Sequence, residues 1–160
     1  MNEDEYWMGR ALLQAKQAYA CGEVPVGCVI IQDGEILGSG HNSVIGSADA
    51  SAHAEIVALR EAGRQIGNYR LVDASLYVTL EPCLMCVGAM VHARVKRLVF
   101  AASEPKAGAV CSRCHAFNFD HLNHKVQWQG GVLGQQAGEL LHLFFEERRL
   151  LKKSERAAKS

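Results

Sequence analysis

Two short motifs in this sequence carry side chains that could hold a metal ion. The first is His53-Ala54-Glu55, and the second is Pro82-Cys83-Leu84-Met85-Cys86. Cys83 and Cys86 are three residues apart, so on a helix both sulfurs lie on one face near its start. The positive potential at that end of a helix favours the thiolate form, which binds soft or borderline cations. With the imidazole of His53 the two thiolates form a Cys2His set, for which zinc is the preferred ion.

Three protein ligands leave the fourth position of a zinc ion open, which is typical of a catalytic site rather than a structural one. Zinc lowers the pKa of a water in that position to about 7, so hydroxide forms near neutral pH. Glu55 is then the candidate proton carrier between this water and a substrate. Taken alone, the C-x-x-C could instead be a redox pair or half of a closed zinc site. The combination of H-x-E with P-C-x-x-C is typical of zinc nucleobase deaminases.

A second C-x-x-C, formed by Cys111 and Cys114, lies in a stretch for which no regular structure is predicted. His115, His121 and His124 follow it, so a second zinc site is one interpretation. Free cysteines in a surface loop are the interpretation we favour, because no regular element fixes four ligands there. Six cysteines in a chain that starts without a secretory signal indicate thiol or metal chemistry rather than a disulfide framework.

The elements that must position these residues can be predicted from composition and periodicity. Ser51 is the expected N-cap of the helix that follows it, Pro82 the first position of another, and Asp33-Gly34 the turn of an initial hairpin. Four helices are expected, over residues 6–20, 52–64, 83–93 and 135–153. Five strands are expected, over residues 26–31, 35–40, 75–80, 96–101 and 125–129. This order predicts an α/β fold, a three-layer α/β/α sandwich around a central mixed five-stranded sheet.

Length and composition indicate one domain of ordinary globular character. The chain has 160 residues, of which 49% are hydrophobic and 21% charged, and its formal net charge is zero. No apolar stretch is long enough to span a bilayer, and the acidic start lacks the apolar run of a secretory signal, so we expect a cytoplasmic protein. Residues 1–150 are expected to form the domain and residues 151–160 a basic tail that continues the last helix. Such a tail suits a polyanion contact, although a solvated helix end is the commoner explanation.

Beyond its two motifs, the chain resembles the bacterial tRNA-specific adenosine deaminases of the cytidine and deoxycytidylate deaminase superfamily. The resemblance covers nearly the whole chain, although the segment over residues 108–115, which contains the second C-x-x-C, departs from the family pattern. The matching segments are Pro25-Val26-Gly27, Gly40-His41-Asn42, residues 52–56, Asn68-Tyr69-Arg70-Leu71, residues 79–86, Gly88-Ala89-Met90, residues 106–109, Asn123-His124-Lys125 and residues 144–149.

This resemblance implies a zinc-dependent hydrolytic deaminase domain over residues 1–150 with the cytidine deaminase-like fold. The implied reaction is conversion of adenosine to inosine at the wobble position of a tRNA anticodon, by a homodimer that has no membrane contact. His53, Cys83 and Cys86 would bind one zinc ion per subunit, and Glu55 would be the catalytic proton carrier.

The resemblance also implies which residues contact the substrate. Asn42 would hydrogen-bond the flipped nucleotide, Val26 would pack on the base, and the backbone N–H groups of Ala54 and Cys83 would bracket the attacking water and the departing ammonia. Four residues are expected to contact RNA, namely Lys106, Phe144, Arg148 and Arg149. For Phe144 a core position on an amphipathic helix is the competing interpretation.

Two other functions stay open at this point. A free nucleobase or nucleoside deaminase, acting on guanine or cytosine, could use the same zinc site, and a net charge of zero suits it better than an RNA-binding protein. A non-catalytic RNA-binding subunit could keep the fold and the metal but would have no need of a proton carrier. The presence of Glu55 argues against that second alternative.

Overall fold

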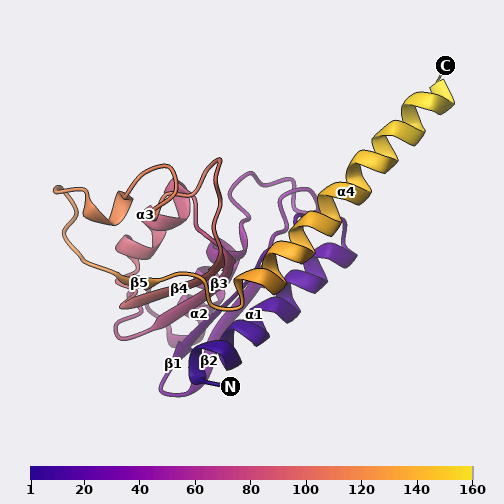
Figure 1. The fold of residues 1–160 in the computed structure, drawn as a ribbon. Helices are drawn as coiled ribbons and strands as arrows, with labels where there is room; N and C mark the ends of the chain where they lie inside the picture. The colour runs from indigo at the N-terminus through magenta and orange to yellow at the C-terminus, as the bar shows by residue number, and fades with distance from the viewer. Residues whose placement is uncertain (160) are drawn as a thin grey trace.

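A five-stranded sheet forms the centre of the protein, whose computed structural model describes residues 1–159 (Figure 1). The strand order is β2-β1-β3-β4-β5; β1 is antiparallel to both of its neighbours, whereas β3, β4 and β5 are parallel. The mixed five-stranded sheet predicted from the sequence is therefore confirmed. The strands are β1 (Gly27–Gln32), β2 (Glu35–His41), β3 (Ser75–Leu80), β4 (Arg97–Ala102) and β5 (Gln127–Gln129).

Four α-helices cover the two faces of this sheet. Helices α1 (Glu3–Ala20) and α4 (Gly134–Lys159) pack on one face, and α2 (Ala54–Ile66) and α3 (Leu84–His92) pack on the other. Successive side chains of a strand point to opposite faces, so a strand between two helical layers must be apolar on both. The run Cys28-Val29-Ile30-Ile31 in β1 meets this need, because its members alternate between the two hydrophobic cores. The result is the predicted α/β/α sandwich.

The first hairpin and the first helix follow local sequence signals. Asp33 and Gly34 both adopt positive φ angles, 52° and 76°, which is what a two-residue turn between β1 and β2 requires. Helix α1 begins at Glu3 rather than at the expected Tyr6, because the side-chain oxygen of Asn2 accepts the N–H of Glu5 at 2.8 Å. Strand β5 is shorter than expected and begins only at residue 127.

Near the two motifs, the helices begin one or two residues later than predicted. His53 is the N-cap of α2, because Ser51 is engaged elsewhere: its N–H and hydroxyl both donate to Asp49 Oδ1. Cys83 is likewise the N-cap of α3, with extended backbone at ψ 173°. Both motifs therefore place a ligand at the last extended residue before a helix, where its side chain can point away from the helix axis.

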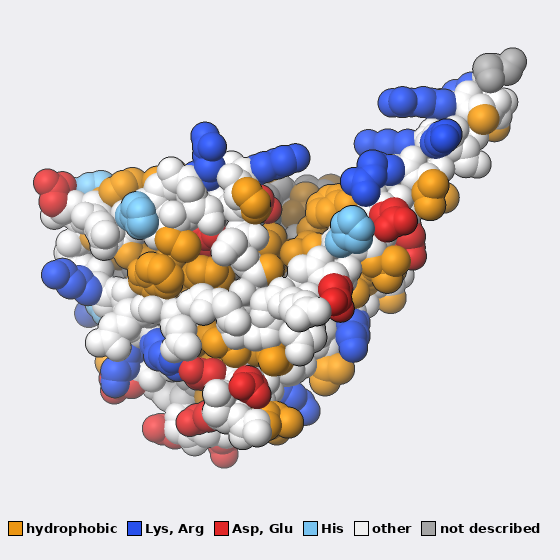
Figure 2. Space-filling model, in the orientation of Figure 1, with side chains coloured by type: hydrophobic (Ala, Val, Ile, Leu, Met, Phe, Trp, Pro, Cys, Tyr) orange, Lys and Arg blue, Asp and Glu red, His pale blue; other side chains and the backbone are white. Residues whose placement is uncertain are grey.

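Helix α4 is the longest element and projects from the sandwich at its C-terminal end (Figure 1). It continues to Lys159, beyond the predicted end at residue 153, and its side chains are exposed from Phe145 onward. Basic side chains gather on this projecting end (Figure 2). None of the helices in the described part of the chain combines the length and the hydropathy that a bilayer crossing needs. The division into a domain and a tail at residue 150 stays a prediction.

Candidate active site

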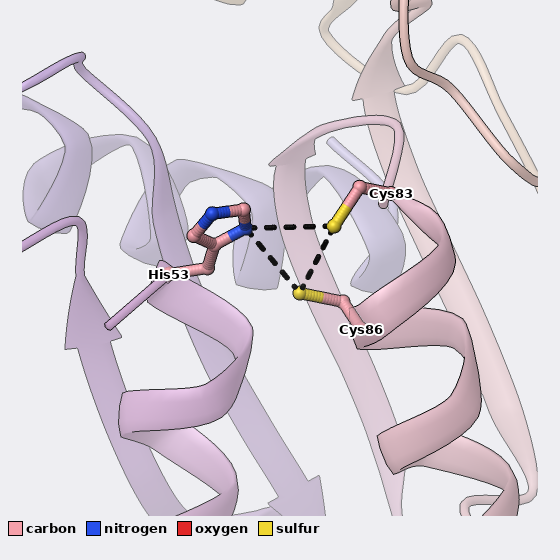
Figure 3. A group of neighbouring side chains, drawn as sticks. All are labelled: His53, Cys83 and Cys86. Carbon is pink, nitrogen blue, oxygen red and sulfur yellow. Dashed lines mark hydrogen bonds between the residues drawn. The ribbon is translucent and has the colours of Figure 1, made fainter. Parts of the chain in front are cut away.

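The beginnings of α2 and α3 lie side by side and bring three ligand side chains together (Figure 3). His53 Nδ1 lies 3.6 Å from the Sγ atoms of both Cys83 and Cys86, and the two Sγ atoms are 3.8 Å apart. A tetrahedral zinc ion with ordinary bond lengths holds two sulfurs about 3.8 Å apart and each sulfur about 3.6 Å from a ligand nitrogen. The spacing of the three donors therefore fits zinc. Within residues 1–159 no other group of three or more such side chains is arranged to hold a metal ion.

The two thiols of this site are prepared to bind a cation. The hydrogen bond with the Cys86 side chain lowers the pKa of Cys83 to about 5, and the backbone N–H groups of Cys86 and Met85 contribute to the same effect. The same hydrogen bond raises the pKa of Cys86, as does the burial of this thiol. The Cys83 sulfur is therefore favoured as a thiolate, and a bound dication would favour thiolate at both positions.

Glu55 lies in the first turn of α2, two residues after the histidine ligand, and its side chain is buried. Burial raises the pKa of this carboxyl group to about 7. A group with a pKa near neutrality can both take up and release a proton at physiological pH. These properties suit the proton carrier expected from the sequence.

The three residues expected to contact the substrate are joined to one another beside the ligands. The backbone N–H of Asn42 donates to the carbonyl oxygen of Val26 at 3.1 Å, and its side-chain Oδ1 accepts the N–H of Ala54 at 2.9 Å. Val26 is buried. The Ala54 N–H therefore has a protein partner, unlike the expectation that it faces the attacking water. The amide nitrogen of Asn42 is the polar atom that this arrangement leaves for a substrate.

Glu81, a buried residue that the sequence prediction missed, holds the loop on one side of the site. Its carboxylate accepts backbone N–H groups from Glu104, Val110, Cys111 and Ser112 at 2.9–3.1 Å, and the Ser112 hydroxyl also donates to it. Burial alone would raise the pKa of Glu81, but these hydrogen bonds outweigh that effect and lower it. The position of a glutamate between an apolar strand and Pro82 was the only signal for this role.

A second buried glutamate holds the loop on the opposite side. Glu23 accepts the backbone N–H groups of Ile45 and Gly46 at 3.1 and 2.7 Å. Nothing in the local sequence indicates this role, because the partners lie more than twenty residues away. Both loops that border the metal ligands are therefore fixed to buried carboxylates.

The second C-x-x-C lies in the loop held by Glu81 and is not part of any metal group in the described residues. Cys111 and Cys114 are free, partly buried thiols, which is the interpretation favoured from the sequence. Burial raises the pKa of Cys111, and the negative charge of Glu81 adds to that effect. Among residues 1–159 no further ligand side chain lies close enough to these two thiols to complete a metal site, so nothing supports a second zinc site here.

A groove of about 610 Å³ between α4 and the residues that follow β4 contains most of the expected RNA contacts. Lys106 lines it from one side, and Arg148, Arg149 and Lys152 line it from α4. Arg148 also donates a hydrogen bond to the carbonyl oxygen of Gly22 at 2.7 Å, which ties α4 to the end of α1. The groove thus places several positive charges beside a helix that is tied to the end of α1.

Phe144 is not available as a stacking surface in this groove. Its ring is 6% exposed and packs edge-on against Tyr19, with the ring centroids 5.6 Å apart. Phe145, which is 44% exposed, lines the groove instead. A step of one residue turns a helix by about 100°, so only one of two adjacent rings can face the core. The core interpretation of Phe144 is therefore confirmed.

Known proteins with similar sequences combine the same fold with the same motifs. The family model of the cytidine and deoxycytidylate deaminase zinc-binding region matches residues 1–102. The chain is 49% identical over 155 residues to the tRNA-specific adenosine deaminase of Haemophilus influenzae, covering 96% of this chain and 90% of that protein. It is 41% identical over 156 residues to the tRNA-specific adenosine deaminase of Bacillus subtilis, covering 98% and 97%.

Solved structures extend this similarity. A structure from a study of A-to-I editing by tRNA:A34 deaminases at the wobble position superposes with a TM-score of 0.82 at 38% identity, covering 84% of this chain and 98% of that one. A guanine deaminase from Bacillus subtilis superposes with a TM-score of 0.60 at 42% identity, covering 64% and 66%. The chain belongs to the cytidine and deoxycytidylate deaminase family and, within it, to the tRNA-specific adenosine deaminases.

Proposed function

We propose that the protein is a zinc-dependent hydrolase that deaminates adenosine to inosine at the wobble position of a tRNA anticodon. The observation that carries this proposal is the set of three donors at zinc spacing beside a buried glutamate, in a chain similar to tRNA-specific adenosine deaminases over nearly its full length. A tRNA substrate also implies a cytoplasmic location.

When bound by His53, Cys83 and Cys86, zinc supplies the charge that makes a water molecule nucleophilic near neutral pH. Glu55 takes a proton from this water as its oxygen adds to C6 of the adenine ring. The same carboxyl group delivers that proton to the ring nitrogen N1. It then carries the remaining proton of the added hydroxyl group to the amino group, and the C6–N6 bond breaks. Ammonia leaves, and the C6 carbonyl of inosine remains.

The substrate residues are arranged to receive a nucleotide that has left the base stack. A base inside a helix cannot present C6 to a recessed site, whereas a nucleotide of an anticodon loop is already partly unstacked. The Asn42 amide nitrogen would donate to this nucleotide, and Val26 would pack on its base. Phe145 would stack on a neighbouring base, and Lys106, Arg148 and Arg149 would contact phosphates.

A homodimer fits the apolar surface beside the site. Leu84 and Met85 follow the Cys83 ligand on α3 and are 58% and 39% exposed. An apolar groove between α2 and α3, lined by Ile56, Leu59 and Ala89 among others, lies on the same side of the sheet. Contact with a second copy of the chain would cover these side chains. Sedimentation equilibrium should give twice the mass of one chain, and Leu84→Asp should lower that mass toward one chain.

The deciding experiment is turnover by the purified, zinc-loaded protein. The substrates are an anticodon stem-loop with adenosine at the wobble position and, separately, free adenosine, guanine and cytosine. We expect inosine in the stem-loop and no loss of an amino group from the small molecules. Deamination of guanine alone would support the alternative suggested by the similarity to a guanine deaminase and would contradict the RNA substrate.

A further inference from the structure

A second concentration of positive charge lies away from both the metal ligands and α4. Arg70, Arg94, Lys96 and Lys125 line one hollow of about 480 Å³, and the only acidic residue in its wall is Asp73. We call this site the basic hollow. None of the ion pairs found among residues 1–159 includes any of the four bases. Because the net charge of the chain is zero, this local excess of unpaired positive charge is the feature that requires an explanation.

The basic hollow is built from three segments that meet at the far end of α3. The helix starts next to Cys83 and ends at His92, so the hollow and the metal ligands are separated by about 14 Å of helix. Arg94 and Lys96 follow the helix, Arg70 comes from the segment before β3, and Lys125 from the segment before β5. A ligand held there cannot also react at the metal ligands, but a long polymer can reach both.

Arg94 occupies a backbone position that favours glycine. It follows the C-cap residue Ala93 of α3 and has a φ angle of 62°, in the left-handed region. An arginine is disfavoured at such a position, and glycine would adopt the same backbone more easily. Its side chain is held in place, because Nη1 donates to the side-chain and backbone oxygens of Asn123 at 3.1 and 3.3 Å. The fixed guanidinium retains further N–H donors for a ligand.

We propose that the basic hollow binds a phosphate group of the tRNA backbone, apart from the nucleotide that is deaminated; this proposal rests on the proposed function. Arginine offers a forked pair of donors to phosphate oxygens, and lysine adds a mobile point charge. Tight clustering of four unpaired bases matches the dense negative charge of a nucleic acid backbone. Together with the groove beside α4, the hollow gives an extended polyanion two separate anchors on one protein.

The test measures affinity for a full-length tRNA with adenosine at the wobble position, from 50 to 200 mM salt, in the Glu55→Ala background. One variant is Lys96→Gln with Lys125→Gln, and another is Arg94→Gly. The matched control is Arg10→Gln with Arg64→Gln, two exposed bases outside the hollow. We expect the double hollow variant to lower the slope of log affinity against log salt by about two and Arg94→Gly by about one, with little change in the control.

Two further readouts separate binding from folding and from chemistry. Arg94→Gly should keep or raise the melting temperature, because glycine suits the backbone at that position, even though tRNA binding is weakened. In the active enzyme the hollow variants should raise KM and leave kcat unchanged, since the lost contact is made equally before and during the reaction. A fall in kcat alone would overturn the proposal.

Equal weakening by the control and the hollow variants would mean that only overall charge matters, and it would overturn the proposal. Inorganic phosphate is tested separately: if it protects the wild type but not the hollow variants from heat, while tRNA affinity is the same for all, the hollow is a small-anion site and the RNA proposal is wrong. Absence of inosine with the wild-type enzyme would overturn the proposed function instead. The hollow would then still be judged by tRNA affinity relative to the control.

Discussion

Cys83 and Cys86 begin a helix opposite His53, whereas Cys111 and Cys114 lie in a loop wound around the carboxylate of Glu81. Both pairs have the C-x-x-C spacing, but the backbone N–H groups around them donate to different acceptors. In the first pair they point at the Cys83 sulfur and lower its pKa, and in the second the N–H of Cys111 donates to the glutamate. In this protein the C-x-x-C that forms the metal site is the one whose surrounding donors stabilise sulfur rather than a neighbouring carboxylate.

Among the variants that test this comparison, removal of a ligand thiol should have the largest effect on zinc content and turnover. Cys86→Ser is expected to lose zinc and to reduce turnover by more than about 10⁴-fold, because it removes the activation of water as well as the proton transfer that depends on it. The matched variant is Cys111→Ser with Cys114→Ser, which should keep its zinc and most of its activity. Zinc content by plasma emission spectroscopy and inosine formation measure both. Loss of zinc from the loop variant would show that the second pair does bind metal.

Glu55→Ala should separate metal binding from catalysis. We expect full zinc content and a loss of about 10²- to 10⁴-fold in kcat, since the carboxyl group moves protons without holding the metal. Glu61→Ala, an exposed position on the same helix, is the control and should behave like the wild type. Comparable activity of the two variants would remove Glu55 from the mechanism.

Glu81→Gln should disturb the loop that carries Cys111 and Cys114 and leave the pair of Cys83 and Cys86 intact. The amide offers one accepting oxygen in place of two and turns an N–H group toward backbone donors, so we expect a loss of about 1–3 kcal/mol in the free energy of unfolding. Zinc content should stay unchanged. Urea denaturation of the variant beside Glu139→Gln, an exposed position, measures the difference. An unchanged stability would mean that the loop does not depend on this carboxylate.

Lowering the pH should give the smallest of these effects. It protonates the same carboxylate, that of Glu81. The pKa of Glu81 is lowered in the folded protein from its ordinary value of 4.5. Its contribution to stability is therefore complete above pH 4.5 and is lost as the pH falls through the lower folded value. Thermal melts between pH 6 and pH 3 should show this loss in the wild type and a shallower one in Glu81→Gln. If the melting temperatures of the two proteins fell in parallel with pH, the role given to Glu81 in acid stability would be contradicted.

The features that followed from the sequence are those with short-range signals. Zinc chemistry restricts the spacing of Cys83 and Cys86, and alternation along β1 predicts burial on both faces. Glu81 and Glu23 were missed because each partner lies in a distant loop that only the folded chain brings near. Two interpretations of Phe144 stayed open, an RNA contact and a core position, because an amphipathic pattern cannot decide which of two adjacent aromatic rings turns inward.

The two loops fixed by Glu23 and Glu81 have a consequence for substrate choice. Because their conformations are set during folding, little ordering of the protein is left for the moment of binding. The RNA rather than the protein must then change conformation for the reaction, because its wobble nucleotide has to leave the base stack to reach Glu55. Anticodon loops that are less tightly stacked before they meet the enzyme should therefore be deaminated faster than stiffer loops of the same local sequence.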